Sequence, residues 1–302
     1  RLLLGEAVWD GRQVDIEYTH ADRTPLGHKC FVRGFVPSRP PEAVPVRGRK
    51  HPLPRDDDEA IALAALELAR HKLTMVFVAQ RRSTEPLGRT ILKCIAARRA
   101  IAEHAGESYG LPVAAEHRAA IDRCVSLIRE HMGEDSNHAH FLGEGFVIHH
   151  SGLPQPVRIA IERLVRAGAV RLVVATTTLA QGVNFPIHTV LVHSLDQGHG
   201  QPVSAMDFWN ICGRAGRGMK ENEGQVLFFA KQCFEEWDAG KCKSSAKFAR
   251  QPAHWRRQSL RACRTRACWP PGSCRWRRRR APWRFRRRHA PGAGAPPGPA
   301  AT

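Results

Sequence analysis

Two hydrophobic patterns alternate along most of the chain. Short continuous apolar runs predict strands that are buried on both faces, and these runs cover residues 75–79, 146–149, 172–175, 189–193 and 225–229. Apolar residues at helical spacing predict helices between the strands, over residues 59–72, 85–103, 114–131, 155–167 and 205–212. Strands that alternate with helices in this way predict an α/β fold with a mainly parallel sheet covered on both faces.

Residues 1–58 give a weaker signal, and we leave them as an unassigned segment and linker. Alternating polarity predicts strands over 12–18 and 30–36, followed at 37–54 by a connector rich in proline and basic residues. This part is either the end of a preceding domain or an insertion. The acidic run Asp-Asp-Asp-Glu at 56–59 predicts a helix N-terminus, where carboxylates meet the favourable end of the helix dipole.

The most informative segment is Trp-Asn-Ile-Cys-Gly-Arg-Ala-Gly-Arg-Gly at 209–218, which holds Arg214 and Arg217, each preceded by a glycine. An arginine presents a planar, permanently charged fork to phosphate oxygens, and glycines leave room for a close approach. The pattern is typical of an arginine finger that reaches a transferring phosphate. Taken alone, the segment also fits a helix end with solvated arginines.

Polar residues follow two of the predicted strands. The strand at 172–175 is followed by Thr176, Thr177 and Thr178, and then by Gly182 and Asn184. The strand at 146–149 leads into His-Ser-Gly-Leu at 150–153. Ligands of open α/β sheets bind outside the carboxyl ends of the strands, so these loops are candidate binding segments.

These motifs resemble a known family in their order and spacing. HHSGL at 149–153, ATTTLAQGVNFP at 175–186 and NICGRAGRG at 210–218 are similar to motifs IVa, V and VI of superfamily 2 helicases, and most similar to the Ski-like branch of the DEAD/DEAH-box proteins. TMVFVAQRRS at 74–83 resembles motif IV. Asn210 departs from the family, which usually has the longer glutamine there. The resemblance implies a RecA-like three-layer domain, the helicase C-terminal domain, over residues 59–232.

The resemblance also implies a role for individual residues. Catalytic arginines facing the γ-phosphate of ATP would be Arg214 and Arg217. Residues that couple the nucleotide to the strand would be Gly182, Asn184, Asn210 and Gly213. Contacts to the nucleic-acid backbone would come from Gln80, Ser151, Gly152, Thr176, Thr177 and Thr178. The alternatives are ion pairs within the domain for the arginines, capping hydroxyls at a strand end for the threonines, and a structural role for His149 and His150.

A nucleotide-cleaving protein of this class also needs a P-loop and an acidic residue that holds Mg²⁺. The nearest segment, Gly-Lys-Cys at 240–242, lacks the hydroxyl that follows the lysine of a P-loop. We therefore expect ATP with Mg²⁺ to be held mainly by a first RecA-like domain, supplied in cis or in trans. The chain is expected to be inactive alone, and its start at Arg1 is consistent with a fragment of a longer protein.

Positive charge is concentrated at one end of the chain. Residues 251–302 contain 14 arginines, no lysine and no acidic residue; subtracting these 14 charges from the net charge of +19 leaves +5 for the rest. A connector at 233–250 precedes this Arg/Pro-rich low-complexity tail. Two interpretations stay open. The tail is a disordered arm that grips phosphates and stacks its tryptophans on bases, or it is the out-of-frame translation of a GC-rich gene.

Cysteine usage and hydropathy bear on the compartment of the protein, on metal binding and on contact with a membrane. The nine cysteines are scattered and no signal peptide is present, which predicts reduced thiols in a cytoplasmic protein. Cys263, Cys268 and Cys274 lack the paired spacing of a zinc site. No apolar run is long enough to span a bilayer, so we expect no membrane partner.

Two hypotheses for the function follow. In the first, the chain is the C-terminal half of an ATP-dependent helicase or translocase, which supplies arginine fingers and part of the track for a single-stranded or duplex DNA or RNA. In the second, it is a non-catalytic nucleic-acid-binding module. Hydrolysis stimulated by nucleic acid, measured after joining the chain to an upstream P-loop domain, discriminates between them.

Overall fold

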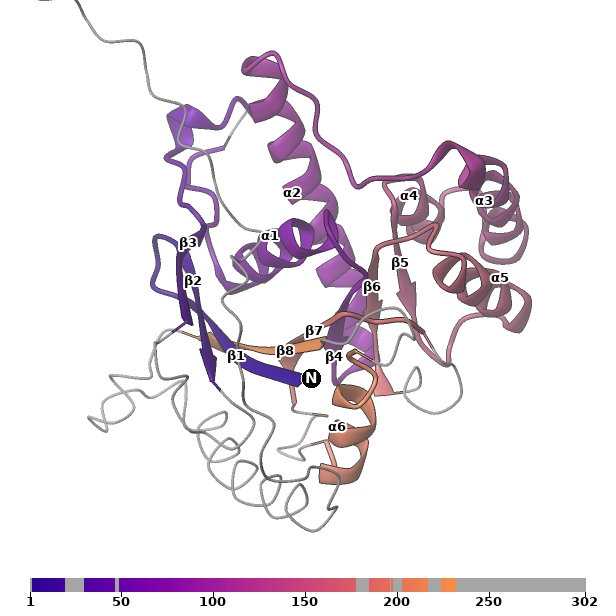
Figure 1. Ribbon diagram of the computed structural model, residues 1–302. Helices are drawn as coiled ribbons and strands as arrows, with labels where there is room; N and C mark the ends of the chain where they lie inside the picture. The colour runs from indigo at the N-terminus through magenta and orange to yellow at the C-terminus, as the bar shows by residue number, and fades with distance from the viewer. Residues whose placement is uncertain are drawn as a thin grey trace, which may run out of the picture. The chain divides into compact units, whose positions relative to one another are not determined.

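The computed structural model describes residues 2–19, 30–46, 49–177, 185–195, 197, 203–216 and 224–231. These residues all belong to one compact unit of the chain. They form an eight-stranded sheet with the order β3-β2-β1-β8-β7-β4-β6-β5 (Figure 1). The strands are β1 (Leu2–Trp9), β2 (Val14–Thr19), β3 (Cys30–Val36), β4 (Thr74–Val78), β5 (Phe146–His149), β6 (Leu172–Ala175), β7 (Thr189–Ser194) and β8 (Gly224–Lys231).

The six neighbouring strands β1, β8, β7, β4, β6 and β5 are all parallel to one another. At the other end of the sheet, β2 pairs antiparallel with both β1 and β3. The predicted α/β class with a mainly parallel sheet is therefore confirmed. The domain boundaries predicted at 233–250 and 251–302 lie outside the described residues.

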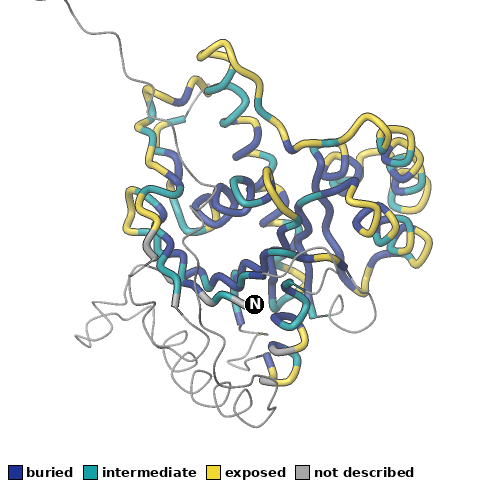
Figure 2. Tube along the Cα trace, viewed as in Figure 1, coloured by how far each residue is buried: buried dark blue, intermediate teal, exposed yellow. Residues whose placement is uncertain are grey.

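Helices cover both faces of the sheet. They are α1 (Asp57–Ala69), α2 (Thr84–His104), α3 (Arg118–Met132), α4 (Asn137–Gly143), α5 (Gln155–Arg166) and α6 (Ala205–Cys212). Alternate residues of β4 enter different cores: Met75 and Phe77 pack with α3, α5 and α6, whereas Val76 and Val78 pack with α1 and α2. Figure 2 shows the strands and most of α1 buried, whereas the outer sides of α3 and α5 are exposed.

The helix boundaries differ from the predicted ones by a few residues. The helix expected over 59–72 ends at Ala69, because a turn precedes β4. The one expected over 114–131 begins at Arg118, after a short 3-10 helix at Ala115–His117. A further helix, α4, was not predicted; its Phe141 and Leu142 enter opposite cores at the edge of the sheet.

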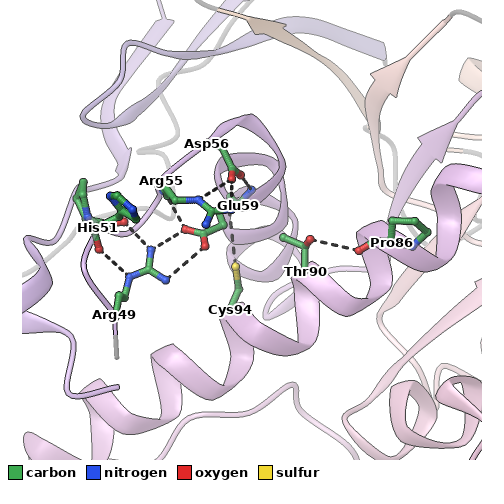
Figure 3. A network of polar contacts seen from close by, with 9 residues as sticks. Arg49, His51, Arg55, Asp56, Glu59, Pro86, Thr90 and Cys94 are labelled. Atoms are coloured by element: carbon green, nitrogen blue, oxygen red, sulfur yellow. Dashed lines mark hydrogen bonds and ion pairs between the residues drawn. The ribbon is translucent and has the colours of Figure 1, made fainter. Parts of the chain in front are cut away.

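The N-terminus of α1 is fixed to the connector by a buried ion pair (Figure 3). The Asp56 side chain accepts a hydrogen bond from the backbone N–H of Glu59 at 3.0 Å, as an N-cap residue does. Glu59 Oε2 in turn lies 2.6 Å from Arg49 Nη2, and their side chains are only 10% and 15% exposed. The same oxygen accepts the backbone N–H of Arg55 at 2.8 Å. The acidic run therefore starts a helix, as predicted, and also attaches the connector to it.

The N-terminal strands continue the same sheet. Strand β1 pairs with β8 over its whole length, and Gly5 of β1 leaves space above the sheet because it has no side chain. A methyl group at Gly5 would come within 3.1 Å of the Tyr18 ring. Tyr18 of β2 crosses this position and donates from its hydroxyl to Gln225 Oε1 of β8 at 2.8 Å. Strands β1 and β2 are thus integrated with β8 rather than separate from it.

Helix α6 runs antiparallel to β7, from the carboxyl edge of the sheet to its amino edge. Before the helix, Val203 donates its backbone N–H to Leu195 O, just beyond the end of β7, at 2.8 Å. After the helix, Gly216 donates to Ile187 O, just before the start of β7, at 2.9 Å. In the part of the chain that the structure describes, no helix is long and apolar enough to cross a membrane.

Candidate functional site

Three neighbouring parallel strands, β4, β6 and β5, end at one edge of the sheet. The registers place Ala175 beside both Phe77 and His149. The residues that follow these ends therefore lie near one another: Gln80, Ser151, Gly152, Thr176 and Thr177. A backbone hydrogen bond from Thr176 N to His149 O, 3.3 Å long, joins two of the three loops. We call this set of loop residues the carboxyl-edge site.

Exposure divides the residues of this site. Ser151 and Gly152 are exposed and Thr177 is half-buried, whereas Thr176 is buried, with 6% of its surface exposed. A buried hydroxyl at a strand end fits the capping alternative for Thr176. The predicted residues Thr178, Gly182 and Asn184 lie outside the described residues.

The loop after β4 holds two arginines close to this edge. The Gln80 side chain is bound by one of them, since Arg82 Nε donates to Gln80 Oε1 at 2.6 Å. The guanidinium of Arg81 lies directly over Gly152 instead. A methyl group at Gly152 would lie 1.9 Å from Arg81 Cζ and 2.1–2.2 Å from its two terminal nitrogens. Glycine is therefore required at 152 for this contact, which places a positive group beside the exposed loop of β5.

Two histidines, the last residue of β5 and the one after it, lie in different surroundings. His149 is buried and its Nε2 lies 3.0 Å from Glu162 Oε1 of α5. Burial lowers the pKa of His149, against the opposing effect of Glu162. Both side chains lie inside the domain, which favours the structural interpretation of His149.

His150 accepts a hydrogen bond from the backbone N–H of Gly152 at its Nδ1, 3.1 Å away. Burial lowers the pKa of His150 to about 4, and the nearby charges of Arg81 and His138 act in the same direction. The ring of His138, on α4, meets it edge-on with the centroids 6.1 Å apart. The neutral ring can accept at Nδ1 only if its proton is on Nε2. Sequence reasoning missed this bond, for which only the i, i+2 spacing of a polar side chain and a glycine was a signal.

The second predicted set lies at the other edge of the sheet. Asn210 is an exposed residue of α6, and Gly213 and Arg214 form the turn that follows it. Gly216 closes this turn with a φ of 76°, a conformation that glycine adopts easily. The structure therefore does not bring Arg214 together with the carboxyl-edge site. Arg217 lies outside the described residues.

The described residues fit part of an ATP site. Arg214 and the glycine turn suit a phosphate oxygen, because the guanidinium is charged and the turn carries little bulk. In the part of the chain that the structure describes, no group of three or more His, Cys, Asp or Glu could hold a metal ion. The guanidinium and the turn together therefore have the chemistry to contact a phosphate.

Comparisons with known proteins agree with this geometry. Residues 119–219 match the helicase conserved C-terminal domain family. The chain is 30% identical over 217 residues to the Hachiman protein HamB of Bacillus cereus, covering 71% of this chain and 18% of that protein. It is 35% identical over 97 residues to the ATP-dependent DNA helicase Hel308 of Aeropyrum pernix, covering 31% of this chain and 13% of that protein.

A similarity of 34% identity over 113 residues extends to the DExH-box ATP-dependent RNA helicase DExH12 of Arabidopsis thaliana, with 36% of this chain and 5% of that protein covered. The chain thus spans less than a fifth of the length of each of these relatives.

Proposed function

Because the chain carries the C-terminal domain of a superfamily 2 helicase, we propose that it is the second RecA-like half of an ATP-dependent nucleic-acid helicase or translocase of the Ski-like branch. Residues 59–232 form this half, and β1–β3 extend its sheet. The observation that carries the proposal is the separation of two surfaces. The loops of the carboxyl-edge site converge at one edge, and the turn with Arg214 is fixed at the other.

The turn after α6 supplies the contribution to hydrolysis. ATP bound with Mg²⁺, held mainly by an N-terminal RecA-like domain in cis or in trans, is the source of the phosphoryl group. Arg214 and Arg217 approach its γ-phosphate and stabilise the negative charge that develops there in the transition state. This contact is coupled to the bound nucleic acid by four residues: Gly182, Asn184, Asn210 and Gly213. The backbone bond from Gly216 to Ile187 keeps the arginine turn in place.

The carboxyl-edge site supplies part of the track for the strand. Ser151 and Thr177 offer hydroxyls, and the exposed Gly152 lets a phosphate approach the backbone. Gln80 and Thr178 complete the set, whereas the buried Thr176 contributes through the end of β6. The chain's relatives include one named a DNA helicase and one named an RNA helicase, and phosphate and hydroxyl contacts suit the backbone of either.

The test uses the full-length protein, with the upstream domain joined to this chain. We expect Arg214→Ala and Arg217→Ala each to lower strand-stimulated ATP turnover about 10³-fold while ATP binding stays within a few-fold of the wild type. Arg163→Ala, which removes an exposed arginine of α5, serves as the matched control and keeps full turnover.

Near-wild-type turnover of both finger variants would rule out the arginine-finger role. A full-length protein that binds single strands but shows no stimulated hydrolysis would favour the non-catalytic binding module. Binding should also fall steeply with salt concentration, since contacts to phosphates release counterions.

A further inference from the structure

The loop that follows β5 is folded by a side chain of its own. The Nδ1 of His150 accepts the backbone N–H of Gly152 at 3.1 Å, and Leu153 donates its backbone N–H to His150 O at 3.2 Å. A side-chain acceptor that binds the backbone N–H two residues later closes the same kind of turn that Asn and Asp form. His150 is 7% exposed, so the turn is anchored from inside the domain.

The turn brings Gly152 into contact with Arg81. Gly152 presents a bare Cα to the guanidinium of Arg81, and a methyl group in the same place would overlap with three atoms of that guanidinium. Arg81 comes from the loop after β4 and His150 from the end of β5. His150 therefore contacts the backbone of Gly152 from the buried side of the loop, and the Arg81 guanidinium lies against the Cα of the same glycine.

We propose that His150 is a positioning residue for the carboxyl-edge site, holding Gly152 in the turn that lets Arg81 and Ser151 face a nucleic-acid phosphate together. This inference rests on the proposed binding of a strand at that edge, and it goes beyond it by naming the group that orders the site. In this proposal His150 does not contact the nucleic acid itself. Its contribution passes through Gly152 to Arg81.

The surroundings of His150 keep its acceptor available. The groups that face it are Arg81 from the loop after β4, His138 from α4 and the neighbouring His149. All of them are positive when charged, and they oppose a second proton on the imidazole. A protonated ring would lose its acceptor at Nδ1 and would repel the guanidinium that the turn positions.

The test measures binding of short fluorescein-labelled single strands of thymidine and of uridine to the full chain by anisotropy, over a range of salt concentrations. His150→Leu removes the acceptor, whereas His150→Asn keeps an oxygen able to bind the N–H of Gly152. Arg81→Gln removes the positioned charge. Lys72→Gln removes a charge from the opposite edge, just before β4, and is the matched control.

We expect His150→Leu and Arg81→Gln each to weaken binding about tenfold. Both variants should also reduce the slope of log affinity against log salt concentration equally, by about 0.7 for the one phosphate contact that is lost. His150→Asn should recover most of the affinity. In the Arg81→Gln background, His150→Leu should cost less than about twofold, because both changes remove one contact. Lys72→Gln should leave affinity and slope within about twofold of the wild type.

The outcomes separate the two proposals. Failure of the wild-type chain to bind either strand overturns the carboxyl-edge site and, with it, the role of His150. If the wild-type chain binds, two results overturn the positioning role alone. One is that the losses of affinity of His150→Leu and Arg81→Gln add in the double variant, and the other is that His150→Leu leaves the salt slope unchanged. Thermal unfolding of each variant identifies a loss of binding that comes from unfolding, and His150→Asn then decides the matter in a folded protein.

Discussion

Gly224, the first residue of β8, lies so close to Ala215 that no side chain fits between them. A methyl group at Gly224 would come within 2.4 Å of the carbonyl carbon of Ala215 and of the backbone nitrogen of Gly216. These backbone atoms cannot rotate away, because Ala215 and Gly216 donate to Cys212 O and Ile187 O. The turn that carries Arg214 is therefore packed directly against the sheet.

Gly224→Ala is expected to lower the free energy of unfolding by about 1–3 kcal/mol, as overpacking does. Denaturant unfolding followed by circular dichroism measures this change. Gly143→Ala is the matched control, since a methyl group there meets nothing within 4 Å, and its stability should not decrease. Equal stability of the Gly224→Ala variant and the wild type would contradict the close packing of the turn.

Glu59→Gln is expected to destabilise the protein by about 3 kcal/mol, because it leaves the charge of Arg49 buried without its partner. The matched control is Arg55→Gln, which removes an ion pair with Asp56 whose side chains are 55% and 42% exposed. Exposed pairs contribute less than about 1 kcal/mol. Chemical denaturation of both variants tests the difference, and equal losses would show that burial does not strengthen the Arg49 pair.

Stability is expected to fall when the pH is lowered below about 6.5, the ordinary pKa of histidine. The folded state lowers the pKa of His150 to about 4 and also lowers those of His138 and His149. In this window the unfolded chain binds protons that the folded domain does not, so acid favours unfolding, by up to about 1.4 kcal/mol per pH unit for each histidine.

Urea unfolding between pH 7 and pH 4.5 measures this slope. The His150→Asn variant lacks one of the three groups and should lose stability less steeply than the wild type. Parallel slopes of the two proteins would show that the pKa of His150 is not lowered in the folded state.

The sequence predicted the strands best where apolar residues run without interruption. The predicted bounds of β5 and β6 coincide with those of the structure, because apolar residues fill both strands apart from His149 at the end of β5. Strand β1 was not predicted; it pairs with the nearby β2 and with β8, which lies more than 200 residues away in the chain. Helix α4 was missed because it has only seven residues and divides its apolar side chains between two cores.

The candidate site could be predicted as a set of loops but not as a set of contacts. Strand ends and parallel pairing were enough to bring Gln80, Gly152 and Thr176 to one edge. The contact of Arg81 with Gly152 depends on a side-chain direction in a short 3-10 turn, which no periodicity encodes. The lowered pKa of His150 arises from burial and from nearby charges, one of which belongs to His138 of α4, a helix that was not predicted.

Helix α6 runs along β7 between the two surfaces. Its eight residues span about 12 Å, with Val203 fixed at one end and Gly216 at the other. Substrate affinity and maximal rate should then respond to different substitutions. Under the proposed function, changes beside Gly152 should raise the concentration of nucleic acid that half-saturates hydrolysis, whereas changes in the turn with Arg214 should lower the rate at saturation.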